Sequence, residues 1–449
     1  MKGFDFYEDF FKKILENKKG DEIFVAFLYE KNDITRYSKS KIHQNTSYEE
    51  MRVGISIKEK NFVVTRFFSN PEIKEAKEIV EKTYEMLKNA VPSDYPGFST
   101  PYTYKNVFTF DDKTFNVSEE ERAEAVYKIS KILGDFEGFG VVNTGGSEIA
   151  LFSSNGLKAY SKLSDAHVTV TAMKDSASGW SEAHSRKFSK LDFEKIAEEA
   201  KFKAEKSFNK IELEPGEYTV FLEPEAVADI FTFASFIGFS AKTYQEKRNF
   251  LFGKLEEKVF SEKLTCFEDP YFEEGFAFPF DFEGVRREKV ELVSKGIAKN
   301  LVYDRKTAFL ENKESTGNAA GFPPSTFPLP FNLVIEKGVK SKDEILKDIE
   351  KGIYVSRFHY TNIVSPSEFI ITGMTRDGTF LIEKGKITKP LKNLRFTDSF
   401  LRVLSQDIEI SKERKLISES SHYDFRFPTG IYAPYILAPS LKFTSGTEF

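Results

Sequence analysis

The spacing of hydrophobic positions changes along this chain, and each spacing predicts a different kind of element. Residues 1–20 and 72–91 carry apolar side chains at intervals of three and four, which predicts amphipathic helices. A further helix is expected to begin at Ser118, which forms a capping-box pattern with Glu121, and another at Asp192, a suitable N-cap. The first half of the chain is therefore expected to contain several helices.

Between these helices, segments rich in β-branched and aromatic residues predict strands. The predicted strands are residues 22–33, 34–45, 51–67, 139–145, 149–156 and 166–175. We interpret the glycine-rich NTGGSE (143–148) as a hairpin turn between two of them. Consecutive strands separated by turn residues indicate a β-meander.

The sequence changes in character near residue 214, after which strands and glycine turns dominate and 221–239 is the strongest helix. Asp377-Gly378 and Lys384-Gly385 are successive turn signals, so they predict a tight antiparallel meander. The proline-rich segment 311–330 is long for a loop in a compact domain, and such loops are usually functional or disordered.

Together these elements predict an α+β fold with two domains. With 449 residues, the chain is long enough to bury two cores. The N-terminal domain, 1–213, is expected to be a β-meander with packed helices. The C-terminal domain, 214–449, is expected to be mostly antiparallel β.

Composition narrows the class of protein. A net charge of −5 gives no electrostatic case for binding nucleic acid. No apolar run reaches the roughly 18–20 residues of a membrane span, and residues 1–20 do not have the pattern of a signal peptide. The single cysteine, Cys266, fits a reducing cytoplasm. Lysine and glutamate are abundant and glutamine is rare, a bias typical of thermophile proteins.

The sequence contains no local zinc-binding pattern. Its histidines are His43, His167, His184, His359 and His422. The nearest two are 17 positions apart, so no His-x-x-x-His pair exists, although a site assembled from distant histidines and Cys266 stays open. The polar group His43-Gln44-Asn45 lies in a predicted strand and is interpreted as a hydrogen-bonding edge, or as a site if a pocket faces it. Trp180 is interpreted as an anchor beneath a loop.

The helix predicted at 221–239 carries two acids inside an apolar stretch. Glu225 and Asp229 are four residues apart and therefore share a face. Pro224 suits the first helical turn, and Glu225 complements the positive end of the helix dipole. The two carboxylates are interpreted as a solvated stripe, with catalysis or the binding of a hard cation as alternatives.

Several stretches resemble one known family along most of the chain. They are TRYSKSKIHQN (35–45), SASGWSEAHSRKFSKLD (176–192), ELEPGEYTVFLEPEAVADIF (212–231), FDFEGVRREKVELVSKGIAKNLVYDRKTA (280–308), STGNAAG (315–321), GIYVSRFHYTNIVSPSEFIITGMTRDGTFLIEKGKI (352–387) and LKNLRF (391–396). Their order and spacing are similar to those of the TldD/PmbA family, whose second branch is called TldE.

The resemblance implies a missing zinc site. The TldD branch looks like a zinc metalloprotease with His-Glu-x-x-x-His on a helix and a further cysteine ligand near the carboxyl end. On this chain the motif falls on PEAVAD: Pro224 stands at the first histidine, Glu225 at the general-base glutamate and Asp229 at the second histidine. Because the carboxyl end has no cysteine either, no cofactor is expected in this chain, and zinc is expected in a TldD-like partner.

The resemblance therefore implies a TldE (PmbA)-like, non-catalytic subunit of a TldD-type zinc metallopeptidase that acts on unfolded peptides. Its partner is expected to be a TldD-like subunit or a second copy, with no nucleic acid and no membrane. One alternative is an autonomous metal-dependent peptidase with a non-standard site, and another is a homodimeric peptide-binding or scaffold protein. His43, Gln44, Asn45, Arg376 and Asp377 are candidate peptide-binding or interface residues.

Overall fold

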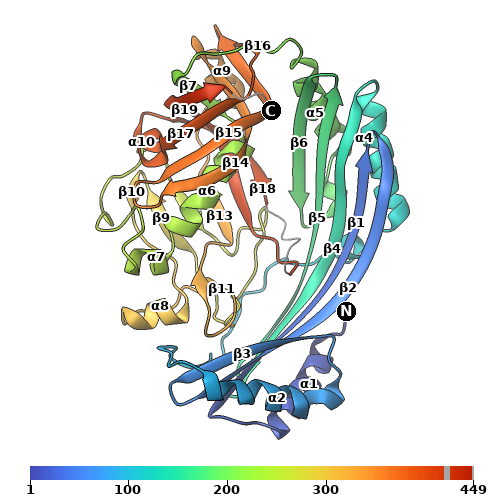
Figure 1. The fold of residues 1–449 in the computed structure, drawn as a ribbon, viewed down its shortest axis with the longest axis vertical. Helices are drawn as coiled ribbons and strands as arrows, with labels where there is room; N and C mark the ends of the chain where they lie inside the picture. Colours follow the sequence, from blue (N-terminus) through green and yellow to red (C-terminus); the bar gives the residue numbers. More distant parts are fainter. Residues whose placement is uncertain (419–424, 447–449) are drawn as a thin grey trace.

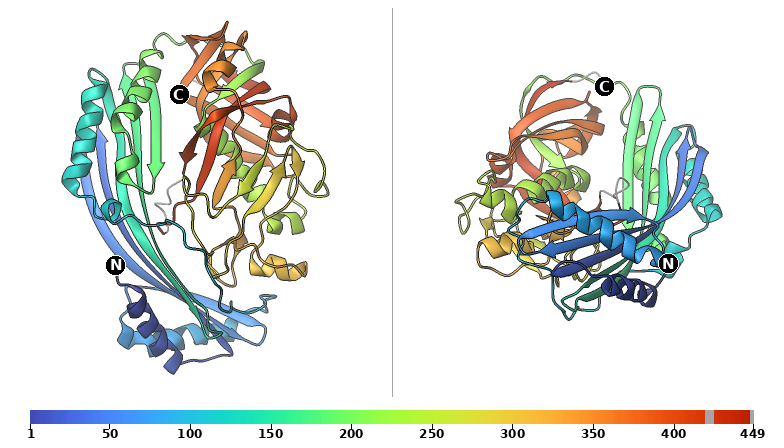
Figure 2. Two further views of the ribbon diagram at one scale, coloured as in Figure 1. Left: turned by 180° about the vertical axis from the view of Figure 1, so that it is seen from behind. Right: turned by 60° about the horizontal axis from the view of Figure 1, so that its bottom comes forward.

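The computed structural model describes residues 1–418 and 425–446 and contains two large β-sheets that lie side by side. The first sheet is built from residues 22–185 and the second begins at residue 216 (Figures 1 and 2). Helices pack on both sheets, so the predicted α+β class, with a helix-covered N-terminal sheet and a mostly antiparallel C-terminal sheet, is confirmed.

The first sheet has the strand order β3-β2-β1-β4-β5-β6, and every neighbouring pair is antiparallel. Its strands are β1 (Glu22–Ser38), β2 (Lys41–Glu59), β3 (Phe62–Ser69), β4 (Glu137–Ser153), β5 (Lys158–Lys174) and β6 (Ala177–Ser185). Two three-stranded meanders, β1 to β3 and β4 to β6, are thus joined by the pairing of β1 with β4.

The predicted break between strands 22–33 and 34–45 is wrong. Strand β1 continues to Ser38, and the turn lies at Lys39-Ser40, where both residues have positive φ (52° and 59°). Neither residue is a glycine or an asparagine, so the sequence carries no ordinary signal for this turn.

The prediction of a hairpin turn at 143–148 is also wrong, because β4 runs straight through this segment. A Cβ on Gly145 would lie 2.1 Å from the Lys31 carbonyl oxygen, and one on Gly146 would lie 2.3 Å from the Leu163 carbonyl oxygen. The glycines therefore let the neighbouring strands β1 and β5 approach β4 closely.

Helices cover the two ends of the first sheet. Helices α1 (Phe4–Glu16) and α2 (Ala76–Tyr84) pack at one end, and α4 (Glu119–Leu133) and α5 (Phe193–Glu205) at the other (Figure 1). The Ser118–Glu121 capping box and the Asp192 N-cap form as predicted. The predicted helix at 72–91 is shorter in the structure, since its α-helical part ends at Tyr84.

The second sheet is mostly antiparallel and partly closed. Because β7 pairs with both β14 and β19, the strands β7, β14, β15, β17 and β19 form a closed ring. Its strands are β7 (Gly216–Leu222), β8 (Cys266–Glu268), β9 (Val290–Ser294), β10 (Ile297–Ala298), β13 (Asn332–Ile335), β14 (Lys351–Ser365), β15 (Ile370–Glu383), β16 (Lys386–Pro390), β17 (Leu394–Ser399), β18 (Glu409–Ile417) and β19 (Gly430–Gly446).

The helix that carries the two predicted acids, α6 (Pro224–Ile237), packs on β14 and β19. The remaining helices are α3 (Asp112–Phe115), α7 (Ala241–Gln245), α8 (Arg305–Leu310), α9 (Lys342–Lys347) and α10 (Phe400–Ser405). The long segment 311–330 forms the short strand pair β11 (Ala319–Ala320) and β12 (Phe327–Pro328).

Of the two turn signals near residue 380, the structure uses one. Lys384-Gly385 turns the chain from β15 into β16. Asp377-Gly378 lies inside β15 instead, with φ values of 53° and 145°, so this part of the predicted meander is wrong. Positive φ occurs both in glycine-containing irregularities within strands and in tight hairpin turns, so the same residue pair suits either one.

Helix α5 lies so close to β6 that a glycine is required between them. A Cβ on Gly179 would lie 2.1 Å from the Ala200 carbonyl oxygen and 2.4 Å from the Ala204 nitrogen. Both atoms belong to the backbone of α5, so the helix itself would have to move.

We predict that Gly179→Ala lowers the free energy of unfolding by about 1–3 kcal/mol, the usual cost of overpacking a tight contact. Chemical denaturation of the purified chain measures this loss. Gly446→Ala is the matched control, because a Cβ there meets no atom of residues 1–418 or 425–446 within 4 Å. Equal stabilities of the two variants would contradict this account of the α5–β6 contact.

Candidate functional site

The start of α6 is buried at the junction of the two sheets. Strand β7 ends at Leu222, Glu223 is the N-cap residue, and Pro224 opens the helix where its missing N–H costs no hydrogen bond. Glu223 and Glu225 are each only 4% exposed. Two carboxylates are therefore held at the positive end of the helix and away from water.

Glu225 does not belong to a solvated stripe, and that interpretation is wrong. Its Oε1 accepts a hydrogen bond from Nζ of Lys415 on β18 at 2.6 Å, and its Oε2 accepts none from any described residue. Asp229, one turn further along, is half-buried and faces a cavity. The two acids share a helix but have different surroundings.

Lys415 joins α6 to the first sheet. Its Nζ lies 2.6 Å from Glu225 and 3.8 Å from Glu199 of α5. Although burial lowers the pKa of Lys415, the carboxylates of Glu225 and Glu199 outweigh burial and raise the pKa above its usual range. The ammonium group is thus charged at neutral pH and serves carboxylates from both halves of the chain.

A second lysine makes an equivalent connection next to the first. Lys203 of α5 donates from Nζ to Oε2 of Glu223 at 2.6 Å and to the Trp180 carbonyl oxygen at 3.1 Å. Tyr354 of β14 donates its hydroxyl hydrogen to the other Glu223 oxygen. Burial raises the pKa of Glu223 despite the nearby Lys203 ammonium group.

The residues at the start of α6 do not fit a catalytic zinc ion. Pro224 has no side-chain atom that could bind a metal. Oε1 of Glu225 accepts a hydrogen bond from the Lys415 ammonium group and is therefore not directed at a site that a metal or its bound water could occupy. Asp229 supplies carboxylate oxygens, but the described part of α6 contains no histidine. The Lys415 ammonium group beside Glu225 also disfavours a second cation there by charge repulsion.

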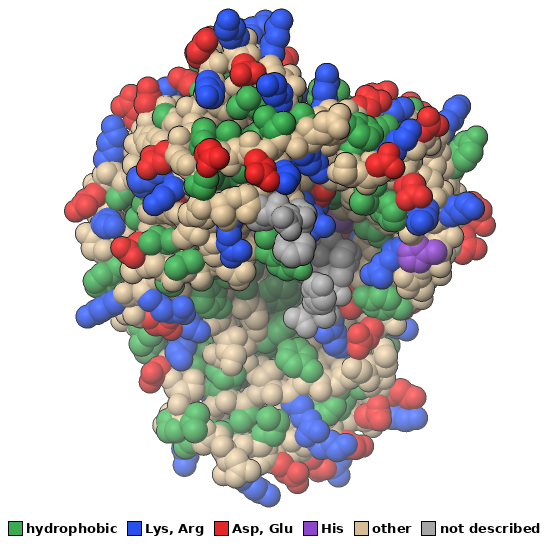
Figure 3. Space-filling view, turned by 45° about the horizontal axis from the view of Figure 1, so that its top comes forward, with side chains coloured by type: hydrophobic (Ala, Val, Ile, Leu, Met, Phe, Trp, Pro, Cys, Tyr) green, Lys and Arg blue, Asp and Glu red, His purple; other side chains and the backbone are tan. Residues whose placement is uncertain are grey.

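A largely apolar cavity of about 560 Å³ adjoins α6 and contains Asp229. Its wall includes Thr232 of α6, Leu28 of the first sheet and Phe331 of the segment after β12. Asp229 is the one ionisable side chain among the described residues that line it. The volume is within the range of small-molecule or side-chain binding pockets, and a hollow with hydrophobic side chains opens on one face of the molecule (Figure 3).

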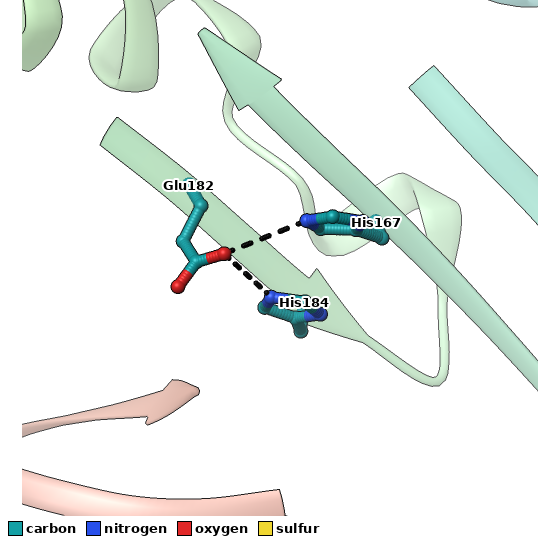
Figure 4. Close-up of side chains that lie close together, drawn as sticks. All are labelled: His167, Glu182 and His184. Carbon is teal, nitrogen blue, oxygen red and sulfur yellow. Dashed lines mark hydrogen bonds and ion pairs between the residues drawn. The ribbon is translucent and has the colours of Figure 1, made fainter. Parts of the chain in front are cut away.

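A second polar cluster lies on the first sheet and was not predicted as a unit. His167 on β5 pairs directly opposite His184 on β6, and Glu182 precedes His184 by two residues on the same face of β6 (Figure 4). One oxygen of Glu182 lies 3.1 Å from Nε2 of His184 and 3.5 Å from Nε2 of His167. Burial, and then the neighbouring imidazole of His184, lower the pKa of His167 to about 4.

The sequence left open a site assembled from distant histidines and Cys266, and this cluster contains only histidines of that set. The structure brings two distant histidines together, but with a glutamate. Cys266 is buried in the core of the second sheet, where burial raises the pKa of its thiol. His422 lies outside the described residues.

The candidate residues His43, Gln44 and Asn45 lie on β2, and His43 and Asn45 are exposed. Asn45 accepts hydrogen bonds from Thr35 and Arg122 and donates to Glu119, so it serves as a hydrogen-bonding edge. This supports the structural interpretation for Asn45.

Arg376 and Asp377 lie on β15, where it meets β6. Asp377 accepts a hydrogen bond from Ser178 at 2.8 Å and pairs with Arg357. The Arg357 guanidinium group stacks on Trp180 with 4.3 Å to the ring centroid, so Trp180 anchors a sheet contact rather than a loop. Four strand spacings of about 4.8 Å, roughly 19 Å in all, separate β2 from β6 across the sheet. His43 on β2 is therefore not brought together with the β6–β15 contact that contains Asp377.

Comparison with known proteins identifies the class. Residues 66–208 match the model of the PmbA/TldA metallopeptidase central domain, and residues 215–445 match that of the PmbA/TldA metallopeptidase C-terminal domain. The second match alone covers more than half of the chain. The chain therefore belongs to the TldD/PmbA family, as the sequence resemblance predicted.

Individual relatives agree with this assignment. An uncharacterized protein of Methanocaldococcus jannaschii is 27% identical over 75% of this chain and 81% of its own length. A protein of Methanothermobacter thermautotrophicus named metalloprotease is 28% identical over 48% of each chain. The crystal structure of TldE from Thermococcus kodakarensis shares the fold with a TM-score of 0.85 and 21% identity, covering 98% of both chains.

None of the helices in residues 1–418 and 425–446 is both long and apolar enough to cross a membrane. This agrees with the absence of a long apolar run in the sequence.

We predict that Lys415→Met lowers the free energy of unfolding by about 3 kcal/mol, because it leaves the Glu225 carboxylate buried without its cation. The double variant Lys415→Met/Glu225→Gln should recover part of this loss, since the buried charge is then absent. Denaturant unfolding measures both changes. Lys412→Met, on an exposed position of the same strand, is the control; if it were as costly as Lys415→Met, the Glu225 pairing would not be the cause.

Proposed function

We propose that this chain is a TldE (PmbA)-like, non-catalytic subunit of a TldD-type zinc metallopeptidase complex that acts on unfolded peptides. The observation that carries the proposal is the start of α6, where Pro224 lacks a ligand atom and Glu225 is bound to the Lys415 ammonium group. In this proposal the chain binds no catalytic zinc on α6. The zinc belongs to a TldD-like partner.

In this proposal the Lys415 ammonium group has the electrostatic role that a metal cation would have beside the glutamate. It supplies a fixed positive charge next to a buried carboxylate, so the carboxylate stays ionised without a metal. An ammonium group cannot lower the pKa of a bound water as zinc does, nor polarise a peptide carbonyl as a Lewis acid. The helix is thereby kept in place while hydrolytic chemistry is left to the partner.

Peptide binding is the function we assign to the cavity beside α6. An apolar volume of about 560 Å³ suits hydrophobic side chains, which are exposed in an unfolded peptide. The edge of β2 between Lys41 and Glu50 offers a second route: among the described residues its strand pairing is with β1 only. An extended peptide can bind such an edge by strand addition.

Two alternatives involve different chemistry. An autonomous metal-dependent peptidase with a non-standard site would use the acids of α6 directly, and a homodimeric peptide-binding or scaffold protein would need no peptidase partner. The pairing of Glu225 with Lys415 speaks against the first, because that carboxylate is engaged by a cation already. Assembly as a heterodimer, in preference to a homodimer, is part of our proposal.

We further propose a cytoplasmic, thermophilic setting without nucleic acid. Cys266 is a buried free thiol, which suits a reducing compartment. Acidic and basic side chains are interspersed on the face shown in Figure 3, with no basic stripe of the kind that tracks a phosphate backbone.

The subunit role is tested by reconstitution. We predict that the purified chain alone does not cleave a labelled unfolded peptide, whereas mixing it with a TldD-like chain from the same genome yields a complex with peptidase activity. Glu225→Gln in this chain should leave the activity of the complex unchanged within about twofold. Cleavage by the chain alone that Glu225→Gln abolishes would overturn the proposal in favour of the autonomous peptidase.

The cavity is tested by filling it. We predict that Thr232→Phe weakens binding of a fluorescent unfolded peptide by roughly tenfold, a loss of about 1.4 kcal/mol, because the larger ring occupies part of the apolar volume. Fluorescence anisotropy measures the dissociation constant. Val339→Phe adds an aromatic ring at a position that is 93% exposed and outside the cavity, so its affinity should match that of the unaltered chain.

A further inference from the structure

The cluster of His167, Glu182 and His184 is set apart from α6 by both its chemistry and its location on the first sheet. Both imidazoles direct Nε2 toward the same oxygen of Glu182, and all three ligand atoms lie within 4.8 Å of one another (Figure 4). The rings are nearly parallel, with centroids 4.0 Å apart and an angle of 9° between their planes. Two imidazoles and one carboxylate therefore present three metal-ligating atoms to the same small region.

We propose that His167, Glu182 and His184 bind one divalent transition-metal ion, with zinc the best match. Imidazole nitrogen and carboxylate oxygen are ligands that zinc accepts, and two histidines with one glutamate form an established three-ligand set. This proposal does not rest on the subunit role proposed above, since it uses neither α6 nor a partner chain.

The distances suit such an ion. Zinc binds nitrogen and oxygen at about 2.0–2.2 Å, so two ligand atoms of a tetrahedral site are roughly 3.3–3.5 Å apart. The two nitrogen-to-oxygen distances in the structure, 3.1 and 3.5 Å, lie close to this value. Small movements of the side chains would bring all three atoms into contact with one ion.

The parallel rings must tilt when the ion binds. A ring nitrogen coordinates a metal in the plane of its ring, and two parallel planes cannot both contain the same ion. The ring torsion of histidine is soft, so opening the stack is a small adjustment. We therefore expect an angle well above 9° between the rings in the metal-bound protein.

The charges around the cluster favour a cation. Glu182 is buried and lies within electrostatic range of the Lys415 ammonium group, but that group is shared with Glu225 and Glu199, so three carboxylates surround one lysine. Arg426 is engaged by Asp165 at 2.7 and 2.9 Å. A divalent ion would balance the charge of Glu182 without displacing any of these pairs.

The burial of the ligands assigns a stabilising role to the ion. The three side chains are at most 10% exposed, which leaves little room for a substrate. The ligands bridge β5 to β6, and β6 carries the contacts with the second sheet at Ser178 and Trp180. A bound ion would thus fasten the strand through which the two sheets are joined.

The test is a titration of the full chain after metal removal with a chelator and desalting. Calorimetry with Zn²⁺ should give one tight site per chain, and Co²⁺ should produce a visible ligand-field band whose intensity reaches its limit at one equivalent. Zn²⁺ should also raise the melting temperature. If the unaltered chain binds neither ion at one equivalent, the proposal is overturned.

Variants identify the ligands. We predict that His184→Ala weakens binding more than roughly 100-fold, since even residues that only support a ligand commonly cost 10–100-fold. Glu182→Gln, which keeps the shape of the side chain, should weaken binding and change the Co²⁺ band, so the test does not depend on one variant folding. His43→Ala removes an exposed histidine on β2, so this variant should bind Zn²⁺ and Co²⁺ with the affinity of the unaltered chain. Unchanged affinity in both cluster variants would overturn the assignment.

Discussion

The structure depends on two lysine ammonium groups that pair with the buried carboxylates of Glu223 and Glu225 where the two sheets meet. Lys203 of α5 reaches Glu223, and Lys415 of β18 reaches both Glu225 and Glu199. Carboxylates buried to this degree are costly unless a cation and hydrogen bonds satisfy them. The Lys203–Glu223 and Lys415–Glu199 pairs each join the two halves of the chain, so these charges are compensated only when the two sheets are packed together.

This dependence explains what α6 can and cannot do. The helix starts with a proline that fixes its first turn, and its N-terminal carboxylates are taken up by lysines from β18 and α5. The position at which a metal-activated water would be needed is therefore already part of the contact between the sheets. The cavity next to it, with Asp229 on its wall, is the part of this region left open for a ligand.

Sequence reasoning predicted the helices better than the strands, for a physical reason. Helix starts at Ser118 and Asp192 depend on hydrogen bonds between residues three positions apart, which the sequence displays directly. Strand ends depend on positive φ, and the residues that allow it serve equally in turns and inside strands. Asp377-Gly378 suggested a turn and proved to lie within β15, while the turn at Lys39-Ser40 carried no signal.

The site was harder to predict, because its partners come from distant positions. Glu225 and Lys415 are 190 residues apart, so no local pattern could show that the glutamate is buried rather than solvated. The histidine cluster did have a local signal: His167 and His184 are equally far from the turn at Asp175-Ser176, so pairing the two strands as a hairpin places them opposite each other. Asp175 has a φ of 53°, and the alternation in residues 166–175 had already marked the first strand. The 17 positions between the two histidines suggested that they were unrelated. Strand register counted outward from the turn at Asp175-Ser176 places them directly opposite each other.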